Sequence, residues 1–273
     1  MKADLHVHST YSDGSKAIHE VLHEAKLNKV THISFVDHDT TAGLQAAQAL
    51  GKHYGVKVIP GVEISAYDYK RNRKVHILGY NYDLEADHIE RLCTPLLKQR
   101  HNHTLWQIDQ IIQAGYLLDI PLMLEVAKPS STLYKQHIMQ QLTSAPYISD
   151  EYQTLYRKLF KNGGVAVGDI KYIDAFDAVK AIVRDGGIAV VAHPGQLDSF
   201  ELIPELVEVG LGGIERNHLD YNQADIAKVE ALAEQYQLIM TGGTDYHGLF
   251  GTSISVGNIT SPINELLNKF ELS

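Results

Sequence analysis

Residues 4–14 read DLHVHSTYSDG, and this stretch near the start of the chain decides how the rest of the sequence is interpreted. His6 and His8 stand two positions apart at the end of an apolar segment, 3–8, that is typical of a β-strand. Side chains alternate along a strand, so both imidazoles are expected to project to the same side and to share a cation. The turn-forming residues that follow can bring the carboxylate of Asp13 back toward them.

Short β-branched segments and helical segments alternate along the chain, which is the pattern of βα units. Seven segments are predicted to be strands: 3–8, 32–36, 56–65, 74–80, 186–195, 211–215 and 238–248. The alternation stops over 85–169, where the sequence is mainly helical. We therefore expect an α/β fold in which residues 1–84 and 170–273 form a barrel domain and 85–169 form a small helical insertion.

The predicted strand ends carry most of the side chains that could bind a metal. In βα barrels, the carboxyl ends of the strands meet at one face, where active sites are built. The candidate ligands at this face are His6, His8, Asp13, His38, Glu63, His76, His193, Asp245 and His247. Eight other histidines lie in helical segments or at the start of a strand, so they are not assigned to a metal: His19, His23, His32, His53, His88, His101, His103 and His137. The concentration of ligands at one end of the strands predicts a metal centre.

The composition of the candidate set indicates the kind of metal centre. Six histidines and three carboxylates are too many ligands for one ion, so two or three divalent ions are expected. Mixed imidazole and carboxylate ligation suits Mn²⁺ or Fe²⁺ as well as Zn²⁺. The carboxylate of Glu63 could bridge two ions. Asp37 precedes His38 and points to the other side of the strand, so it is expected to orient a ligating imidazole instead of binding a metal itself.

The bulk composition excludes several classes of protein. A net charge of −9 argues against a general binder of duplex nucleic acid or of membrane surfaces. The single cysteine, Cys93, excludes an internal disulfide framework and fits a reducing compartment. The sequence shows no signal-peptide core and no apolar stretch long enough to span a bilayer, so we expect a cytoplasmic protein. The sequence does not indicate an oligomeric state.

The motifs DLHVHSTYSDG, VDHDT, PGVEIS, VHILGY, AHPG and GGTDYHG occur in the order found in the PHP (polymerase and histidinol phosphatase) superfamily, which the chain resembles on both sides of the insertion. The resemblance implies a distorted (β/α)7 barrel with a trinuclear metal site. It also implies a ligand set for each metal: His6, His8, Glu63 and Asp245 for the first, Glu63, His76 and His193 for the second, and Asp13, His38 and His247 for the third. Glu63 would then bridge two metals.

Within that superfamily, the insertion resembles the cap of the TrpH-like phosphoesterases, which act on nucleoside 3′,5′-bisphosphates and short 5′-phosphorylated oligonucleotides. The segment YKQHIMQQL resembles their Arg-x-His-Ile-Ala motif, with Lys135 in place of Arg and Met139 in place of Ala. The segment GIERNH also departs from the group, with Arg216 where an apolar residue is common. The resemblance implies a metal-dependent phosphoesterase in which a metal-bound hydroxide attacks phosphorus. Lys135, Arg216 and His218 would then bind a phosphate of the substrate.

Four alternatives stay open. His218 could protonate the leaving oxygen instead of holding phosphate, and Lys135 and Arg216 could be solvated surface charges. The substrate could be histidinol phosphate, although the basic residues of the insertion favour a nucleotide or a short oligonucleotide. The chain could also be a non-catalytic metal-binding PHP module, a role that the complete ligand set disfavours.

Overall fold

The computed structural model describes residues 1–262, in which strands and helices alternate as expected. Three parallel strands form one sheet in the order β1 (Ala3–Val7), β2 (His32–Phe35) and β3 (Lys57–Val58). Six strands form the other, in the order β6 (Ile173–Asp174), β4 (Gly61–Asp68), β5 (Arg73–Tyr80), β7 (Ile188–Val191), β8 (Gly213–Asn217) and β9 (Ile239–Gly242). The predicted strand 56–65 is divided near Pro60 into β3 and β4, which lie in different sheets.

The two sheets meet at both edges and enclose a common interior. At one edge, Val7 pairs with Tyr246, which follows β9, and the His8 N–H donates to the Tyr246 carbonyl at 2.9 Å. At the other, His38 pairs with Glu63 of β4. Strands β1, β2, β4, β5, β7, β8 and β9 thus form the expected distorted seven-stranded barrel. Its interior is filled by apolar side chains that include Leu5 and Tyr80.

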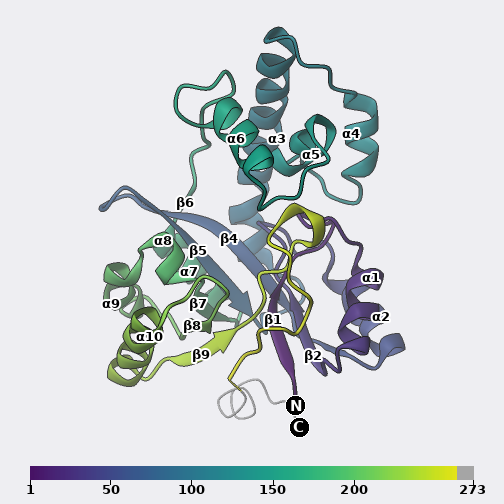
Figure 1. The fold of residues 1–273 in the computed structure, drawn as a ribbon. Helices are drawn as coiled ribbons and strands as arrows, with labels where there is room; N and C mark the ends of the chain where they lie inside the picture. The colour runs from purple at the N-terminus through teal and green to yellow at the C-terminus, as the bar shows by residue number, and fades with distance from the viewer. Residues whose placement is uncertain (263–273) are drawn as a thin grey trace.

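Helices cover the outside of the barrel (Figure 1). Helices α1 (Ile18–Leu27) and α2 (Leu44–Tyr54) lie beside β1 and β2, while α7 (Ala175–Arg184), α8 (Pro194–Leu197), α9 (Ile203–Val207) and α10 (Gln223–Tyr236) lie on the larger sheet. Helix α1 shows why these segments pack there, since its buried residues Ile18, Val21, Leu22 and Ala25 recur at helical spacing. A 3₁₀ turn, η1 (Phe200–Leu202), precedes α9 in this layer, and a second, η2 (Gly248–Phe250), directly follows His247. Within residues 1–262, no helix is long and apolar enough to cross a membrane.

The strand directions differ from the sequence expectation at β5. Strands β4 and β5 form an antiparallel hairpin in which Ser65 pairs with His76, and β5 is also antiparallel to β7. The prediction that His76 lies at the carboxyl end of a parallel strand is therefore wrong. His76 lies in the first half of β5, and that strand runs from the site toward the opposite end of the barrel. The imidazole still reaches the site because the hairpin reverses the strand.

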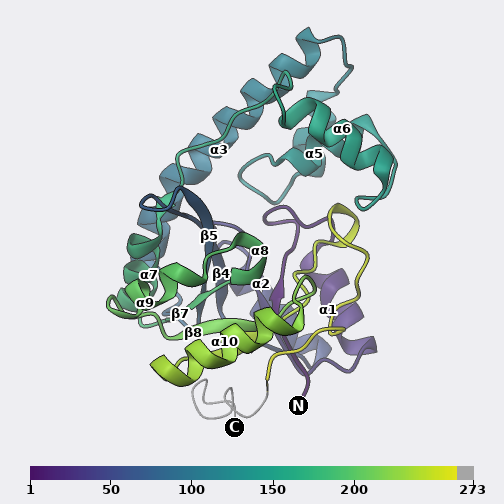
Figure 2. The ribbon, with the colours of Figure 1, turned by 60° about the vertical axis from the view of Figure 1, so that its left-hand side comes forward.

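The predicted insertion consists of four helices that lie over the carboxyl ends of the barrel strands: α3 (Asp87–Gln113), α4 (Ile120–Val126), α5 (Lys135–Leu142) and α6 (Asp150–Phe160). Figure 2 shows α3 running from the side of the barrel into the insertion. Its first half packs Ile89 and Leu96 into the barrel's outer core. Its second half packs Ile108 and Ile111 against α4, α5 and α6. One helix therefore joins two hydrophobic cores, and the domain boundaries at 85 and 169 stay predictions.

Candidate metal centre

A bulge in β1 places the two histidines of the opening motif. Asp4 pairs with Ile33 and Val7 with Phe35, so β1 carries one residue more than β2 between these pairs. The extra residue lets Leu5 pack in the barrel interior while His6 and His8 point to Glu63. The distances from Glu63 Oε2 are 3.4 Å to His6 Nε2 and 3.1 Å to His8 Nε2. The two imidazoles thus lie together, as the alternation predicted.

The two carboxylate oxygens of Glu63 face different histidines. Oε1 lies 2.8 Å from His76 Nδ1 and 3.0 Å from His193 Nε2. Oε2 faces His6 and His8, and it also lies 3.4 Å from His38 Nδ1. The side chain of Glu63 is almost completely buried. This arrangement is the one that a bridging carboxylate requires, with each oxygen directed at a separate set of ligands.

Two further carboxylates complete the cluster. Asp245 Oδ1 lies 3.2 Å from His6 Nε2 and 3.4 Å from His8 Nε2. Asp13 Oδ1 lies 3.3 Å from His247 Nε2, and Asp13 Oδ2 lies 3.9 Å from His38 Nε2. The resulting groups that could hold a metal are His6, His8, Glu63 and Asp245; His8, Asp13, His38 and His247; and His38, Glu63 and His76. These groups contain eight of the nine candidate ligands, and His193 joins them through its 3.0 Å contact with Glu63 Oε1.

The residues present fit metal ions. Ligand atoms about 2.0–2.2 Å from a common ion lie roughly 3–3.5 Å apart, which matches the nitrogen–oxygen separations found here. Both ring nitrogens of His8, Nδ1 of His38 and Oδ1 of Asp13 are buried and have no hydrogen-bond partner within residues 1–262. Buried polar atoms almost always have a partner. Several unpartnered ligand atoms aimed at one small volume therefore indicate bound cations.

The charges of the cluster also favour cations. Burial opposes ionisation of Glu63 and Asp245, but the surrounding imidazoles hold the pKa of both carboxyls well below their usual range. Burial likewise opposes protonation of His8, yet the carboxylates of Asp245 and Glu63 raise the pKa of its imidazole to about 10. A ligating imidazole must be neutral, so metal ions would replace these protons and release them to solvent.

Two acidic residues orient the cluster from outside. Glu215 is fully buried; its Oε1 lies 2.9 Å from His6 Nδ1 and its Oε2 accepts from the His193 N–H at 2.8 Å. Asp37 is buried too, but it makes no hydrogen bond to an imidazole in the described part of the chain, residues 1–262. It accepts from Ser9 N–H, from the Ser9 hydroxyl and from the Ser12 hydroxyl at 2.6–2.8 Å. The expectation that Asp37 orients a ligating imidazole is therefore wrong, because it holds the loop that carries Asp13.

The three predicted phosphate-binding residues lie in different places in the structure. His218 lies in the cluster, with Nε2 3.4 Å from Asp245 Oδ2. Lys135 lines the adjoining cavity. Arg216 points to the outer face of β8, where its Nε donates to Glu230 of α10 at 2.9 Å. Its predicted role in phosphate binding is therefore wrong. Side chains alternate along β8, so the inward position of Glu215 sends Arg216 outward.

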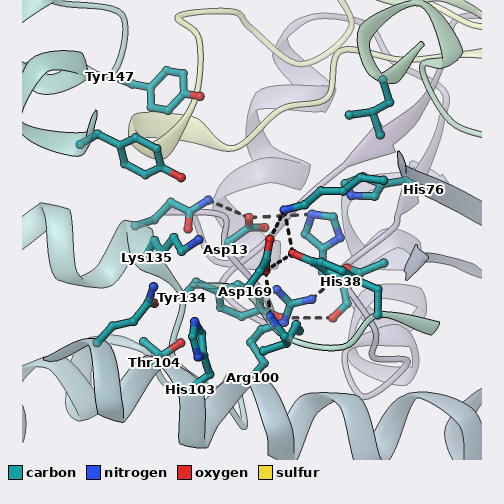
Figure 3. Close-up of a pocket in the computed structure, with 18 of the residues that line it drawn as sticks. Asp13, His38, His76, Arg100, His103, Thr104, Tyr134, Lys135, Tyr147 and Asp169 are labelled. Carbon is teal, nitrogen blue, oxygen red and sulfur yellow. Dashed lines mark hydrogen bonds and ion pairs between the residues drawn. The ribbon is translucent and has the colours of Figure 1, made fainter. Parts of the chain in front are cut away.

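A cavity of about 430 Å³ separates the metal-ligand cluster from the insertion. Figure 3 shows Asp13 and His38 of the cluster and Lys135 and His103 of the insertion among the residues that line it. Lys135 makes no hydrogen bond or ion pair with another residue in 1–262, and its Nζ lies 5.7 Å from the centre of the Phe160 ring. Burial lowers the pKa of its ammonium group to about 8. An unpaired cation in a cavity beside a metal centre is suited to an anionic group of a ligand.

The cavity also contains residues that the sequence did not single out. Arg100 of α3 donates from Nη2 to Asp39 Oδ2 at 2.7 Å and to the Ser65 hydroxyl at 2.9 Å. Gln136 of α5 donates to Asp13 Oδ2 at 2.9 Å. In sequence, Arg100 and Gln136 lie far from these partners, and no local pattern marks them. Only the adjacency of Gln136 to Lys135 offered a signal.

Comparison with known proteins agrees with this geometry. The PHP domain family matches residues 4–184. The chain is 54% identical to phosphoribosyl 1,2-cyclic phosphate 1,2-diphosphodiesterase of Eggerthella lenta, over 94% of this chain and 98% of that protein. It is 28% identical to a 5′-3′ exoribonuclease of Haemophilus influenzae, over 90% of each chain. It is 27% identical to a 3′,5′-nucleoside bisphosphate phosphatase of Chromobacterium violaceum, over 89% of this chain and 86% of that one.

Solved structures show the same fold. A Bifidobacterium adolescentis structure superposes with a TM-score of 0.87 at 23% identity, covering 97% of this chain and 94% of that one. A Chromobacterium violaceum protein described as an amidohydrolase, with bound sulfate and no metal, superposes with a TM-score of 0.83 at 26% identity. It covers 95% of this chain and 91% of its own. Together with the family match and the named relatives, the metal-ligand cluster shows that this chain belongs to the PHP domain family and is a metal-dependent phosphoesterase.

Proposed function

We propose that this chain hydrolyses the cyclic phosphodiester of a phosphorylated ribose, the substrate class of its Eggerthella lenta relative. The observation that carries the proposal is 54% identity over nearly the whole of both chains, about twice the identity to the exoribonuclease and the bisphosphate phosphatase. In this reaction one P–O bond opens. Water supplies hydroxide to phosphorus and a proton to the released sugar oxygen.

The metal centre would hold two or three divalent ions, with Mn²⁺, Fe²⁺ and Zn²⁺ as the candidates. The proposed ligand sets are His6, His8, Glu63 and Asp245; Glu63, His76 and His193; and Asp13, His38 and His247. When bound, such ions activate water near neutral pH and neutralise the charge of the phosphoryl oxygens. Glu215 orients His6 by accepting a hydrogen bond from its Nδ1–H, which leaves Nε2 directed at Glu63 and Asp245.

Lys135 would bind the second phosphate group of the substrate, the one that is not hydrolysed. Its ammonium group has no acidic partner in an ion pair within residues 1–262, whereas Lys74 and Arg100, which line the same cavity, are paired with Asp169 and Asp39. A charge-assisted contact to phosphate would satisfy Lys135. Lys135, Asp13 and His38 line the same cavity, so a substrate with two phosphate groups could contact both the ammonium group and the metal-ligand cluster.

His218 is the candidate for proton delivery to the leaving oxygen. Its side chain is buried beside Asp245, and its Nδ1 accepts a hydrogen bond from the Asp220 N–H at 3.3 Å. In the neutral ring, that bond leaves the proton on Nε2, which faces the cluster. Although burial favours the neutral ring, the hydrogen bond to Asp245 and the charge of Glu215 raise the pKa of His218. A protonated imidazole directed at the site can act as a general acid.

A second candidate substrate is a nucleoside 3′,5′-bisphosphate or a short 5′-phosphorylated oligonucleotide. The observation that favours it is an aromatic wall of the cavity, formed by Tyr147, Tyr152 and Tyr156 of the insertion. Tyrosine rings stack on nucleobases, at about 1–3 kcal/mol per base. A phosphorylated ribose without a base would leave this wall unused.

The test is a comparison of kcat/KM for phosphoribosyl 1,2-cyclic phosphate, a nucleoside 3′,5′-bisphosphate, a 5′-phosphorylated trinucleotide and histidinol phosphate, each measured with Mn²⁺, Fe²⁺ or Zn²⁺. The cyclic phosphate should give the highest value. A higher value for either nucleotide would replace the first proposal with the second. His6→Ala and His247→Ala proteins serve as controls, because they should remain folded, by circular dichroism, and lose hydrolysis.

A further inference from the structure

The first turn of α5 lies against one part of the metal-ligand cluster. Gln136, the second residue of this helix, donates from Nε2 to Asp13 Oδ2 at 2.9 Å. That contact leaves Asp13 Oδ1 facing His247 Nε2 at 3.3 Å. Asp13 Oδ2 is therefore held by the insertion, and rotation of the Asp13 side chain is restricted.

The same turn contacts the two neighbouring ligand segments. Tyr134, which precedes α5, donates from its hydroxyl to the His38 carbonyl at 3.2 Å. The His137 ring packs edge-on against Phe250 at 5.8 Å between centroids, and Phe250 ends the 3₁₀ turn that directly follows His247. His137 is itself held, because its Nδ1 accepts from the Tyr134 N–H at 3.0 Å.

These contacts all involve the segments that carry one of the proposed ligand sets. Asp13, His38 and His247 form one set, and each segment that carries them is touched by Tyr134, Gln136 or His137. Within residues 1–262, the hydrogen bonds from the insertion to the nine candidate ligands are those to Asp13 and His38. The remaining candidate ligands are held by the barrel itself, as Glu215 holds His6 and the His193 backbone.

We propose that the first turn of α5 is a positioning element for the metal subsite of Asp13, His38 and His247, so that an ion there and the insertion stabilise each other. The inference rests on the ligand sets of the proposed function but on no particular substrate. Partners that orient metal ligands typically contribute about 10- to 100-fold to metal affinity. Because linkage is reciprocal, an ion that binds more tightly when α5 is docked must also dock α5 more firmly.

The first experiment measures Mn²⁺ binding to the metal-free full-length protein, by isothermal calorimetry and by elemental analysis after dialysis. Gln136→Ala should weaken one Mn²⁺ site by about 10- to 100-fold and leave the others as in the parent. Tyr134→Phe keeps the ring and removes only the hydroxyl, so it should weaken the same site to a smaller extent. Gln140→Ala is the matched control, because Gln140 is an exposed residue of the same helix and should bind Mn²⁺ as the parent does.

The second experiment measures amide hydrogen exchange of α5 with and without Mn²⁺. Exchange in α5 should slow when the ions bind, and Asp13→Asn should abolish that slowing while α7 in the barrel behaves as in the parent. The proposal is overturned if Gln136→Ala binds every ion with parental affinity, if it weakens all sites equally, or if Mn²⁺ leaves exchange in α5 unchanged. No substrate is used, so a wrong substrate assignment cannot produce any of these results.

Discussion

Glu215 Oε1 lies 2.9 Å from His6 Nδ1, and both side chains are fully buried. This contact places the proton of His6 on Nδ1, so the lone pair of Nε2 faces Glu63 and Asp245. The other oxygen of Glu215 accepts from the His193 backbone at 2.8 Å. One carboxylate thus positions two strand ends that carry predicted ligands. The two residues stand 209 positions apart in the sequence.

Glu215→Gln should therefore weaken metal binding without adding or removing a ligand. An amide oxygen accepts a hydrogen bond less strongly than a carboxylate oxygen, and the amide nitrogen cannot accept one at all. We expect a loss of about 10- to 100-fold in metal affinity, the range typical of partners that orient ligands. Metal content after dialysis against graded chelator concentrations measures it. Parental affinity in Glu215→Gln would show that His6 is held by its ring packing alone.

Glu63→Gln should lower the content of more than one ion. Each carboxylate oxygen of Glu63 faces a different group of histidines, and a neutral amide has only one oxygen to offer. Elemental analysis of the purified variant, compared with His76→Ala as a variant expected to affect one subsite, measures the effect. Full metal occupancy in Glu63→Gln would refute the bridging role.

Lys135→Ala should reduce kcat/KM for a substrate with two phosphate groups much more than for a small aryl phosphate. Losing one charge-assisted contact costs about 1.5–3 kcal/mol, which is roughly one to two decades in affinity. The measurement is the ratio of kcat/KM values for the two substrates, variant against parent. Equal losses would place Lys135 at the reacting phosphate or in the fold, and no loss would make it a surface charge.

The pH dependence of kcat/KM for the same two substrates supplies an independent test. Burial lowers the pKa of the Lys135 ammonium group from its usual value to about 8, so its charge is present below that pH and lost as the pH rises through it. A phosphate monoester is already dianionic there, because its second pKa is about 6. kcat/KM for the two-phosphate substrate should fall above about pH 8, and Lys135→Arg should remove that fall. An unchanged profile in Lys135→Arg would assign the fall to another group.

Arg216→Ala should leave kcat/KM within about twofold of the parent. The guanidinium pairs with Glu230 on the outer face of β8, and exposed ion pairs contribute little, about 0.2–1 kcal/mol, to stability. Steady-state kinetics and a thermal melt measure the two effects. A loss of activity on the scale expected for Lys135→Ala would restore the interpretation of Arg216 as a phosphate ligand.

The sequence by itself determined the ligand types and most of their positions. Alternation along a strand puts His6 and His8 on one side, and the motif order placed Glu63, His193 and Asp245 at ends that converge in any βα barrel. These are consequences of local periodicity and chain direction, which the residues themselves encode. The sequence did not distinguish Glu215 from Arg216: only the structure shows that Glu215 faces His6 and that Arg216 lies on the outer face of β8.

Only the tertiary structure decided which segments that are distant in sequence contact one another. The β4–β5 hairpin reverses the strand that carries His76, and α3 brings Arg100 back to Asp39. Helix α5 brings Gln136 to Asp13, although 123 positions separate them. Periodicity specifies which face of an element is apolar, but not which neighbour that face meets. That choice depends on how all the elements bury their surfaces together, so it emerges only when the chain has packed.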